Sequence, residues 1–195
     1  MPMVPSDDVD RFDRWGRTYD RSFLQRIFFG PVQAAMLDLA GEYFAKNPPG
    51  SILDIGCGTG RLLQSAGRKW PAARLAGIDP AQSMLAAAKA TNPVADLRSS
   101  FAETLPFDDQ SFDLVTTSLS FHHWKDQAKA LHEICRVVKS GGRLCIADPT
   151  FPLAKLVNDR VRSRKVLWKM MAEAGFTVVR SIRKRFVLIT LAALA

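Results

Sequence analysis

Residues 52–60, ILDIGCGTG, decide the fold of this chain. Apolar residues lead directly into three glycines, Gly56, Gly58 and Gly60, spaced two positions apart. An apolar run that ends in glycines predicts a buried parallel strand followed by a tight loop. The next residues, 61–69, carry apolar side chains on one face and predict a helix. Strand, glycine loop and helix together predict the corner of a doubly wound α/β sheet at which nucleotides bind.

The glycine loop does not fit two common nucleotide-binding motifs. A dinucleotide fingerprint needs a third glycine where this chain has Arg61, and a P-loop needs a Lys-Ser/Thr pair that does not follow here. Asp54 lies in the strand, two positions before the first glycine. Its carboxylate would repel a pyrophosphate and attract a cationic ligand.

Residues 52–60 resemble motif I of the class I S-adenosylmethionine-dependent methyltransferases. They consist of two apolar residues, Asp54, one apolar residue and Gly-Cys-Gly-Thr-Gly. The resemblance implies S-adenosylmethionine as cofactor and S-adenosylhomocysteine as product, and it is strongest to the small-molecule branch that contains the quinone-biosynthesis methyltransferases (methyltransferase type 11 domain). It also implies an α/β fold with a Rossmann-like doubly wound sheet. The family's sheet has seven strands in the order 3-2-1-4-5-7-6, with strand 7 antiparallel and helices on both faces.

The rest of the chain supplies the expected alternation of strands and helices. Apolar periodicity predicts further strands at 73–79, 94–101, 112–119 and 143–148, helices at 81–90, 126–139 and 153–174, and a final strand pair at 177–182 and 186–191. Repeated β–α units predict a parallel sheet with right-handed crossovers. The short link in the final pair predicts an antiparallel hairpin.

The segment before the glycine corner is expected to form a helical cap over residues 1–49, with the methyltransferase domain at 50–195. Helical spacing extends over 10–29 and 31–44, and we expect both helices to lie over the carboxyl edge of the sheet. Tyr19, followed by an aspartate, resembles a tyrosine–aspartate pair that precedes motif I in many of these enzymes. The resemblance implies that Tyr19 closes over the methionine end of the cofactor; packing between the two helices is the alternative.

Asp79 ends the second predicted strand, 19 residues after Gly60. A carboxylate at that position can accept hydrogen bonds from both ribose hydroxyls. Asp79 also fits the N-cap position of the following helix, with Pro80 at the first helical position. The two roles can coexist on two oxygens.

Residues 100–107, SFAETLPF, resemble the third-strand motif of the family, in which an aspartate bonds the adenine amino group. Phe101 stands in place of that aspartate, so the hydrogen bond is lost and the ring can only stack or pack. The backbone of Ala102 and Glu103 remains available to the adenine.

Residues 118–124, SLSFHHW, follow the fourth strand, where the family places the methyl group and the acceptor. His122 and His123 are the candidate general bases, because histidine titrates near neutral pH. A structural role for both histidines is the alternative. Asp126 is expected to be the N-cap of the next helix.

The predicted site residues therefore fall into two groups, with no metal site. The catalytic candidates are His122 and His123. The predicted cofactor-binding residues are Tyr19, Asp54, Gly56, Cys57, Gly58, Gly60, Asp79, Pro80, Met84, Ala102, Glu103 and Ser118.

Composition limits the other possibilities. A length of 195 residues is typical of one domain with its own hydrophobic core. No apolar run approaches the roughly 20 residues of a membrane helix, and the N-terminus does not look like a secretory signal. The cysteines, Cys57, Cys135 and Cys145, show no metal-binding spacing, so we expect reduced thiols and a cytoplasmic protein.

Charge is distributed unevenly. Residues 136–195 hold 13 Lys and Arg against 3 Asp and Glu, whereas residues 1–135 hold 14 against 16. This basic third predicts either a surface for an acidic partner or an ordinary solvated face.

Three functions remain open at this point. The first is methyl transfer to a small-molecule acceptor by in-line displacement, driven mainly by proximity and orientation. The second is a non-catalytic S-adenosylmethionine-binding module or partner subunit. The third is nucleic-acid methylation that uses the basic third, although the Asn/Asp-Pro-Pro-Tyr/Phe signature is absent after the fourth strand. Monomer and homodimer are both open.

Overall fold

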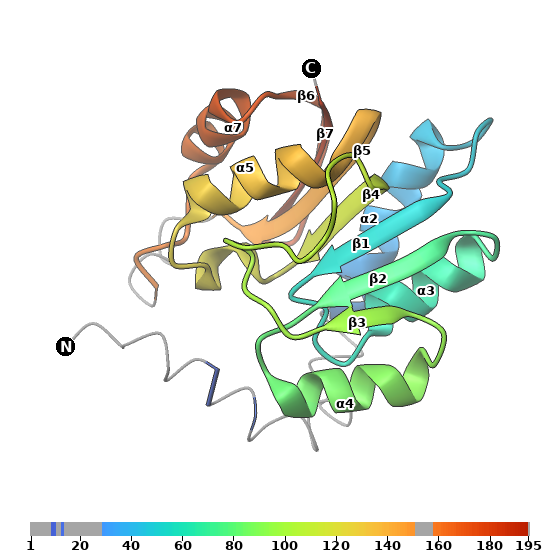
Figure 1. Ribbon diagram of the computed structural model, residues 1–195. Helices are drawn as coiled ribbons and strands as arrows, with labels where there is room; N and C mark the ends of the chain where they lie inside the picture. Colours follow the sequence, from blue (N-terminus) through green and yellow to red (C-terminus); the bar gives the residue numbers. More distant parts are fainter. Residues whose placement is uncertain (1–8, 11–12, 14–28, 151–157, 195) are drawn as a thin grey trace.

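The computed structural model describes residues 9–10, 13, 29–150 and 158–194 (Figure 1). A single seven-stranded sheet runs through this part of the chain. Its strands are β1 (Ser51–Ile55), β2 (Arg74–Ile78), β3 (Asp96–Arg98), β4 (Phe112–Ser118), β5 (Val138–Pro149), β6 (Phe176–Lys184) and β7 (Val187–Leu194). The helices are α2 (Gly30–Tyr43), α3 (Arg61–Lys69), α4 (Gln82–Thr91), α5 (Gln127–Val137) and α7 (Arg164–Glu173), with a 3-10 turn η3 at Phe121–His123.

The predicted strand order is confirmed: the sheet reads β3-β2-β1-β4-β5-β7-β6. β1 pairs in parallel with both β2 and β4, and β5 continues the parallel sheet. β7 is antiparallel to its two neighbours, β5 and β6. Because the carboxyl ends of parallel strands meet at one edge, the loops after β1, β2 and β4 lie together there.

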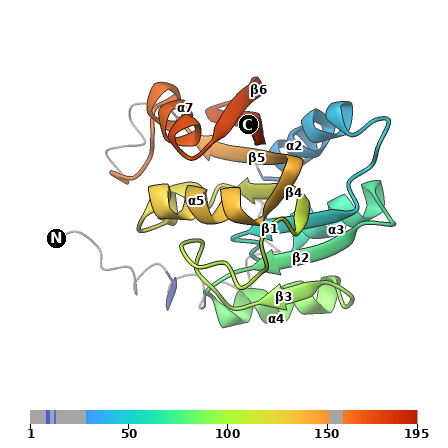
Figure 2. The same cartoon turned by 45° about the horizontal axis from the view of Figure 1, so that its top comes forward.

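Helices cover both faces of the sheet (Figures 1 and 2). Side chains alternate along a strand, so neighbouring residues of β1 enter different cores. Leu53 packs in the cluster that includes Leu131 of α5, whereas Ile52 packs with Met36 of α2. The sheet is therefore buried on both faces, as a parallel sheet requires.

The position of α2 differs from the expected one. Its Met36 and Ala40 are fully buried in the same cluster as Ile52 and Ile189, on the face of the sheet. The expectation that this helix lies over the carboxyl edge is therefore wrong, because its apolar side chains complete the core. The other expected N-terminal helix, at 10–29, lies almost entirely outside the described residues.

Two further boundaries differ from the predicted ones. α7 begins at Arg164, because the Ser163 side chain accepts a hydrogen bond from the Val166 N–H and caps the helix there. Residues 158–163, which were predicted to be helical, are therefore outside the helix. β5 begins at Val138 rather than 143, because Val138 pairs with Phe112 before an irregularity in the ladder. A local hydrogen bond overrides the apolar pattern at α7, and pairing with a strand distant in the sequence overrides it at β5.

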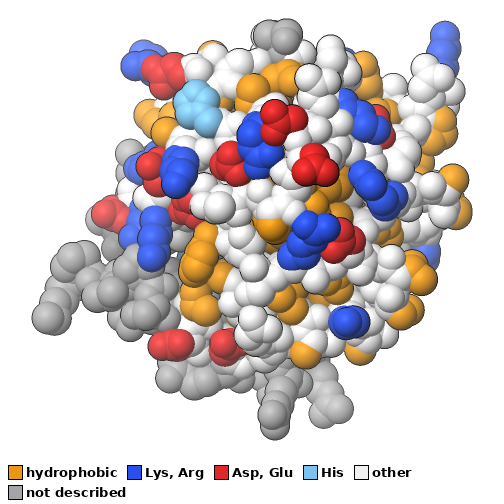
Figure 3. Space-filling model, in the orientation of Figure 1, with side chains coloured by type: hydrophobic (Ala, Val, Ile, Leu, Met, Phe, Trp, Pro, Cys, Tyr) orange, Lys and Arg blue, Asp and Glu red, His pale blue; other side chains and the backbone are white. Residues whose placement is uncertain are grey.

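Charges are mixed on one face of the described surface. Basic and acidic side chains are interspersed over the face shown in Figure 3. Ion pairs include Arg98 with Asp96 at 2.7 Å and Arg136 with Asp109 at 2.8 Å. In the part of the chain that the structure describes, no helix has the length and apolar character needed to cross a membrane.

Candidate functional site

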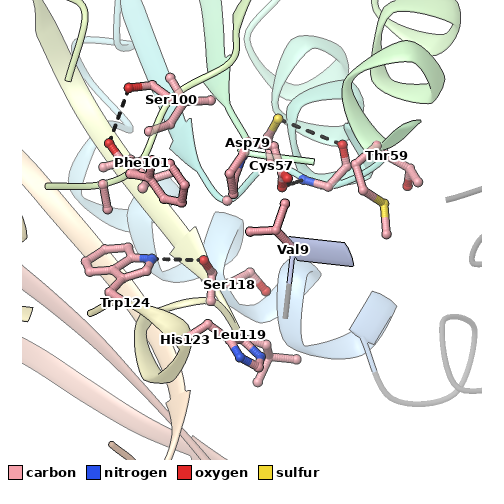
Figure 4. Close-up of a pocket in the computed structure, with 18 of the residues that line it drawn as sticks. Val9, Cys57, Thr59, Asp79, Ser100, Phe101, Ser118, Leu119, His123 and Trp124 are labelled. Carbon is pink, nitrogen blue, oxygen red and sulfur yellow. Dashed lines mark hydrogen bonds between the residues drawn. The ribbon is translucent and has the colours of Figure 1, made fainter. Parts of the chain in front are cut away.

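A cavity of about 150 Å³ opens at the carboxyl ends of β1, β2 and β4 (Figure 4). The last residues of these strands, Ile55, Ile78 and Ser118, form part of its wall. The remaining lining residues are Val9, Phe29, Gln33, Gly56, Cys57, Gly58, Thr59, Arg61, Asp79, Pro80, Met84, Ser100, Phe101, Ala102, Glu103, Leu119, Ser120, His123, Trp124 and Lys125.

The three glycines of the loop have left-handed backbone conformations for different reasons. A Cβ added to Gly56 would lie 2.1 Å from Ser120 Oγ, and one added to Gly60 would lie 2.4 Å from Asn92 Nδ2. Those two glycines are required by packing. Gly58, at φ +52°, has nothing within 4 Å of the same point, so it faces the open cavity. Gly58 is therefore the place where a ligand can approach the backbone closely.

Asp79 ties the end of β2 to the glycine loop. Its Oδ2 accepts the Gly58 N–H at 2.9 Å and its Oδ1 accepts the Ala81 N–H at 2.9 Å. Burial raises the pKa of this carboxyl, and the two N–H donors partly oppose that shift. Each carboxylate oxygen can accept more than one hydrogen bond, so Asp79 keeps capacity for a ligand.

The N-cap role expected for Asp79 is wrong, because α4 begins at Gln82 with Ala81 as its N-cap. A residue far away in the sequence satisfies the first turn instead. Asp13 Oδ1 accepts the Ser83 N–H at 2.9 Å, and Ser83 Oγ donates to the Asp13 carbonyl at 2.8 Å. These two hydrogen bonds join Asp13 to the first turn of α4, whose Met84 lines the cavity.

Asp54 lies behind the loop rather than in the cavity wall. It is 2% exposed, and its Oδ1 accepts the Thr116 hydroxyl at 2.9 Å. Burial raises the pKa of Asp54 to about 7, the Thr116 hydrogen bond lowers it, and the charge of Asp79 raises it further. Any attraction that Asp54 exerts on a cation acts through the loop and depends on its ionisation.

Asp54→Asn is expected to flatten the pH dependence of stability. The folded-state pKa of Asp54, about 7, exceeds its ordinary value of 3.8, so the folded protein holds the proton more tightly than the unfolded chain does. The free energy of unfolding should therefore fall as pH rises from about 5 to about 7.5. Urea unfolding of the cofactor-free proteins at several pH values should show that the free energy of unfolding falls less with pH in the variant than in the wild type. If the free energy of unfolding changes equally with pH in the two proteins, Asp54 does not titrate in this range.

Phe101 and Lys125 form the wall on the β3 side. The Phe101 side chain is 48% exposed, and Lys125 Nζ lies 5.5 Å from its ring centroid. The Glu103 carboxylate is already used within the protein, because Oε1 accepts the N–H groups of Lys125 at 2.7 Å and Asp126 at 3.0 Å. The backbone of Glu103 remains available to a ligand. Asp126 is the N-cap of α5, as predicted.

Phe101→Asp is expected to tighten S-adenosylmethionine binding about fivefold, which corresponds to about 1 kcal/mol for one added hydrogen bond. The physical reason is the adenine contact that the family's aspartate supplies. Calorimetry on both proteins measures the difference. A weaker complex would show that the Phe101 ring itself contributes to binding, and Phe101→Leu, which also removes the ring, should then weaken binding similarly.

The loop after β4 supplies the remaining wall. Trp124 Nε1 donates to Ser120 Oγ at 3.1 Å, and His123 faces the cavity. Ser118 Oγ is buried without a hydrogen-bond partner among the described residues. His122 does not line the cavity; its Nδ1 lies 2.8 Å from Asp148 Oδ1.

Most predicted cofactor-binding residues lie together in the cavity wall. Those that line it are Gly56, Cys57, Gly58, Asp79, Pro80, Met84, Ala102, Glu103 and Ser118. Asp54 and Gly60 lie behind it, and Tyr19 lies outside the described residues. Sequence reasoning missed the lining residues Val9, Phe29 and Gln33, because no motif gave a signal for them. Leu119, Ser120 and Trp124 belong to the loop at 118–124, but the sequence did not assign them to the cofactor site.

The residues present fit S-adenosylmethionine. Gly58 leaves room at the backbone, Asp79 is a buried acceptor, and Ser118 offers a hydroxyl without a partner. Met84 and Phe101 add apolar surface for a flat base. Among the described residues, no group of three or more His, Cys, Asp or Glu side chains is arranged to hold a metal ion.

Comparison with known proteins agrees with this geometry. Residues 53–146 match a family model described as a methyltransferase domain. A demethylmenaquinone methyltransferase of Chlorobaculum tepidum is 34% identical over 145 residues, which cover 72% of this chain and 59% of the relative. A malonyl-[acyl-carrier protein] O-methyltransferase of Methylococcus capsulatus is 35% identical over 131 residues, which cover 66% of this chain and 47% of the relative. The chain thus spans about half to three-fifths of the length of these relatives.

Solved structures share the fold. An S-adenosylmethionine-dependent methyltransferase of Thermotoga maritima, described as a possible histamine N-methyltransferase, superposes with a TM-score of 0.74 at 21% identity, covering 94% of this chain and 98% of that one. One from Aquifex aeolicus gives 0.72 at 19% identity, covering 99% and 100%. At these identities the likeness concerns the fold alone.

Proposed function

The chain belongs to the family of class I S-adenosylmethionine-dependent methyltransferases, and on that premise we propose that it transfers a methyl group from S-adenosylmethionine to a small-molecule acceptor. The observation that carries the proposal is the corner where Gly58 faces open space while its N–H is held by Asp79. At that corner, a backbone that a ligand can approach closely and a carboxylate lie together at one end of the cavity.

The cofactor of this family supplies a methyl group bound to a positively charged sulfur. The protein's own part is to bind and orient. Gly58 would leave room for the cofactor beside the loop. Asp79 would accept hydrogen bonds from the ribose hydroxyls, and Phe101 with Ala102 would contact the base. A displacement from positive sulfur neutralises charge, so the protein does not have to stabilise a new anion. Orientation and exclusion of water are then the main contributions.

The acceptor would enter on the side of the loop after β4. Leu119 and His123 line the cavity there, away from Asp79 and Phe101 (Figure 4). The names of the relatives specify different acceptors, a quinone precursor and a carrier-bound malonyl group. We therefore propose a small organic acceptor without choosing between these classes.

We propose that the N-terminal part of the chain covers this site. Val9 and Phe29 line the cavity, and Asp13 bonds the first turn of α4. Because α2 belongs to the core, the proposed cap is confined to the residues before Gly30. Tyr19 stays a proposed member of the cap.

Asp13→Ala is expected to lower cofactor affinity severalfold and to destabilise the protein by about 1 kcal/mol, the usual cost of a lost helix cap. The affinity should fall because Val9 loses its attachment beside the cavity. Ser163→Ala is the matched control, since it removes the cap of α7 without touching a cavity residue. If both variants bind S-adenosylmethionine like the wild type, the N-terminal residues before Gly30 are not part of the site.

The test of the proposed function is release of labelled methyl groups onto defined acceptors. A panel should contain a naphthoquinol, a malonyl thioester, tRNA and DNA. We expect transfer to a small acceptor and none to nucleic acid, because the face shown in Figure 3 mixes both charges and the Asn/Asp-Pro-Pro-Tyr/Phe signature is absent after the fourth strand. Cofactor binding without transfer to any small acceptor would favour the non-catalytic alternative, and methylation of nucleic acid would favour the third.

A further inference from the structure

We infer that Asn92 is a positioning residue of the cofactor site: from the end of α4 it holds the turn that presents Gly58 to the cavity. The inference rests on the proposed function and names a residue that no motif in the sequence indicated. Asn92 is 32 residues away from Gly60 in the sequence, and it is not one of the residues that line the cavity. Its effect on the cofactor would therefore act through the glycine loop.

Asn92 carries a buried amide at the C-terminus of α4. The residue is 5% exposed and is the C-cap of the helix, where its backbone N–H donates to the Ala88 carbonyl at 2.8 Å. Its Nδ2 donates to the Gly60 carbonyl at 3.0 Å, and it also lies 3.2 Å from the Ala88 carbonyl and 2.9 Å from Thr91 Oγ1. Carbonyl oxygens only accept hydrogen bonds, so the nitrogen of the amide must face them. Burying this amide is favourable only because it is hydrogen-bonded in this way.

The Gly60 carbonyl lies where the glycine loop becomes a helix. Gly60 is the N-cap of α3, and its carbonyl also accepts the Gln64 N–H at 2.9 Å. The Gly60 N–H donates to the Cys57 carbonyl at 2.9 Å, which closes the turn at 57–60 that contains Gly58. Asn92 thus holds one end of the turn in which Gly58 lies.

The beginning and the end of the loop are held in different ways. At the beginning, the Cys57 N–H donates to the Ile78 carbonyl of β2 at 2.9 Å, which is a hydrogen bond between backbone groups. At the end, side chains of α4 make the contacts: Asn92 bonds the loop directly, and Thr91 Oγ1 lies 3.1 Å from the Thr59 carbonyl. A substitution at Asn92 would therefore release the end of the loop while its beginning stays in place.

A cofactor that packs against the Gly58 backbone needs that backbone in one position. A binding loop that is already ordered loses less conformational freedom when the ligand binds, so its affinity is higher. Displacements of about 0.5 Å are enough to weaken a site of this kind. Loss of the Asn92 amide should therefore reduce cofactor affinity even though it removes no contact with the cofactor.

Asn92→Ala in the full chain tests the inference, with S-adenosylhomocysteine as the probe. We expect calorimetry to show an affinity about tenfold lower than in the wild type. We also expect the Gly58 amide signal to move in a ¹⁵N-glycine spectrum of the ligand-free protein, which contains only 12 glycines to assign. The Asn92 side chain bonds Gly60 rather than Gly58, so this movement reports a displaced turn and not a lost neighbour.

Ser51→Ala is the matched control. Ser51 is also a buried polar residue, at 3% exposure, and its hydroxyl bonds the Ser111 carbonyl and the Asp113 carboxylate at the opposite edge of the sheet. The control should lower the melting temperature and leave both the Gly58 signal and the affinity for S-adenosylhomocysteine unchanged.

An unchanged Gly58 signal or wild-type affinity in Asn92→Ala would overturn the inference, whatever happens to the melting temperature. If that variant does not fold, Thr91→Val replaces it and is judged by the same two measurements, because it removes the hydroxyl that Asn92 Nδ2 contacts. Failure of S-adenosylhomocysteine to bind the wild type would instead refute the proposed function. The Gly58 signal of the ligand-free variants would then still decide whether Asn92 positions the turn.

Discussion

Gly58→Val is expected to reduce S-adenosylmethionine affinity by at least about 100-fold. Gly58 faces the open cavity, and a β-branched side chain would occupy the space that the cofactor needs. The same side chain is strained at φ +52°, which costs about 1–3 kcal/mol of stability. Calorimetry measures the loss of affinity, and thermal unfolding measures the strain.

Gly141→Val separates these two effects. Gly141 also has a left-handed backbone, at φ +76°, with nothing within 4 Å of an added Cβ, but it lies outside the cavity wall. It should lose comparable stability and keep full cofactor affinity. If Gly58→Val binds as tightly as Gly141→Val, the glycine loop does not hold the cofactor.

Asp79→Ala is expected to lower cofactor affinity by about 10- to 150-fold, which corresponds to the roughly 1.5–3 kcal/mol of hydrogen bonds to a charged group. It should also lower the melting temperature, because the N–H groups of Gly58 and Ala81 lose their acceptor. Calorimetry and thermal unfolding on the same protein give both quantities.

Asp113→Ala is the control for Asp79. Asp113 also holds a network, with Ser51 and Lys139, but at the opposite edge of the sheet. It should lose stability without losing affinity. If Asp79→Ala behaves the same way, Asp79 is only a structural link between β2 and the glycine loop.

The strands and most helices could be predicted because their apolar periodicity is local. β1 and α3 have the predicted bounds within one residue, since the glycine loop marks where the strand ends and the helix begins. Asp79 could be placed at the site because it follows a strand whose end the pattern shows, whereas Ala102 and Ser118 were placed there by the resemblance of their segments to the family's motifs. The sheet order came only from family resemblance, because local spacing says nothing about which strands are neighbours.

What could not be predicted depends on contacts distant in the sequence. Asp148 and His122 are 26 residues apart, and Asp13 and Ser83 are 70 apart. The depth of Asp54 follows from strand packing and not from its distance to the glycines. The role of α2 was missed because its apolar face fits a core and a cap equally well.

The most direct test of the central claim is calorimetry of the wild-type protein with S-adenosylmethionine, repeated in the presence of NADH as competitor. We predict one site per chain, no competition by NADH, and loss of the binding signal in Gly58→Val but not in Gly141→Val. No binding of S-adenosylmethionine, or binding of NADH at this loop instead, would contradict the account.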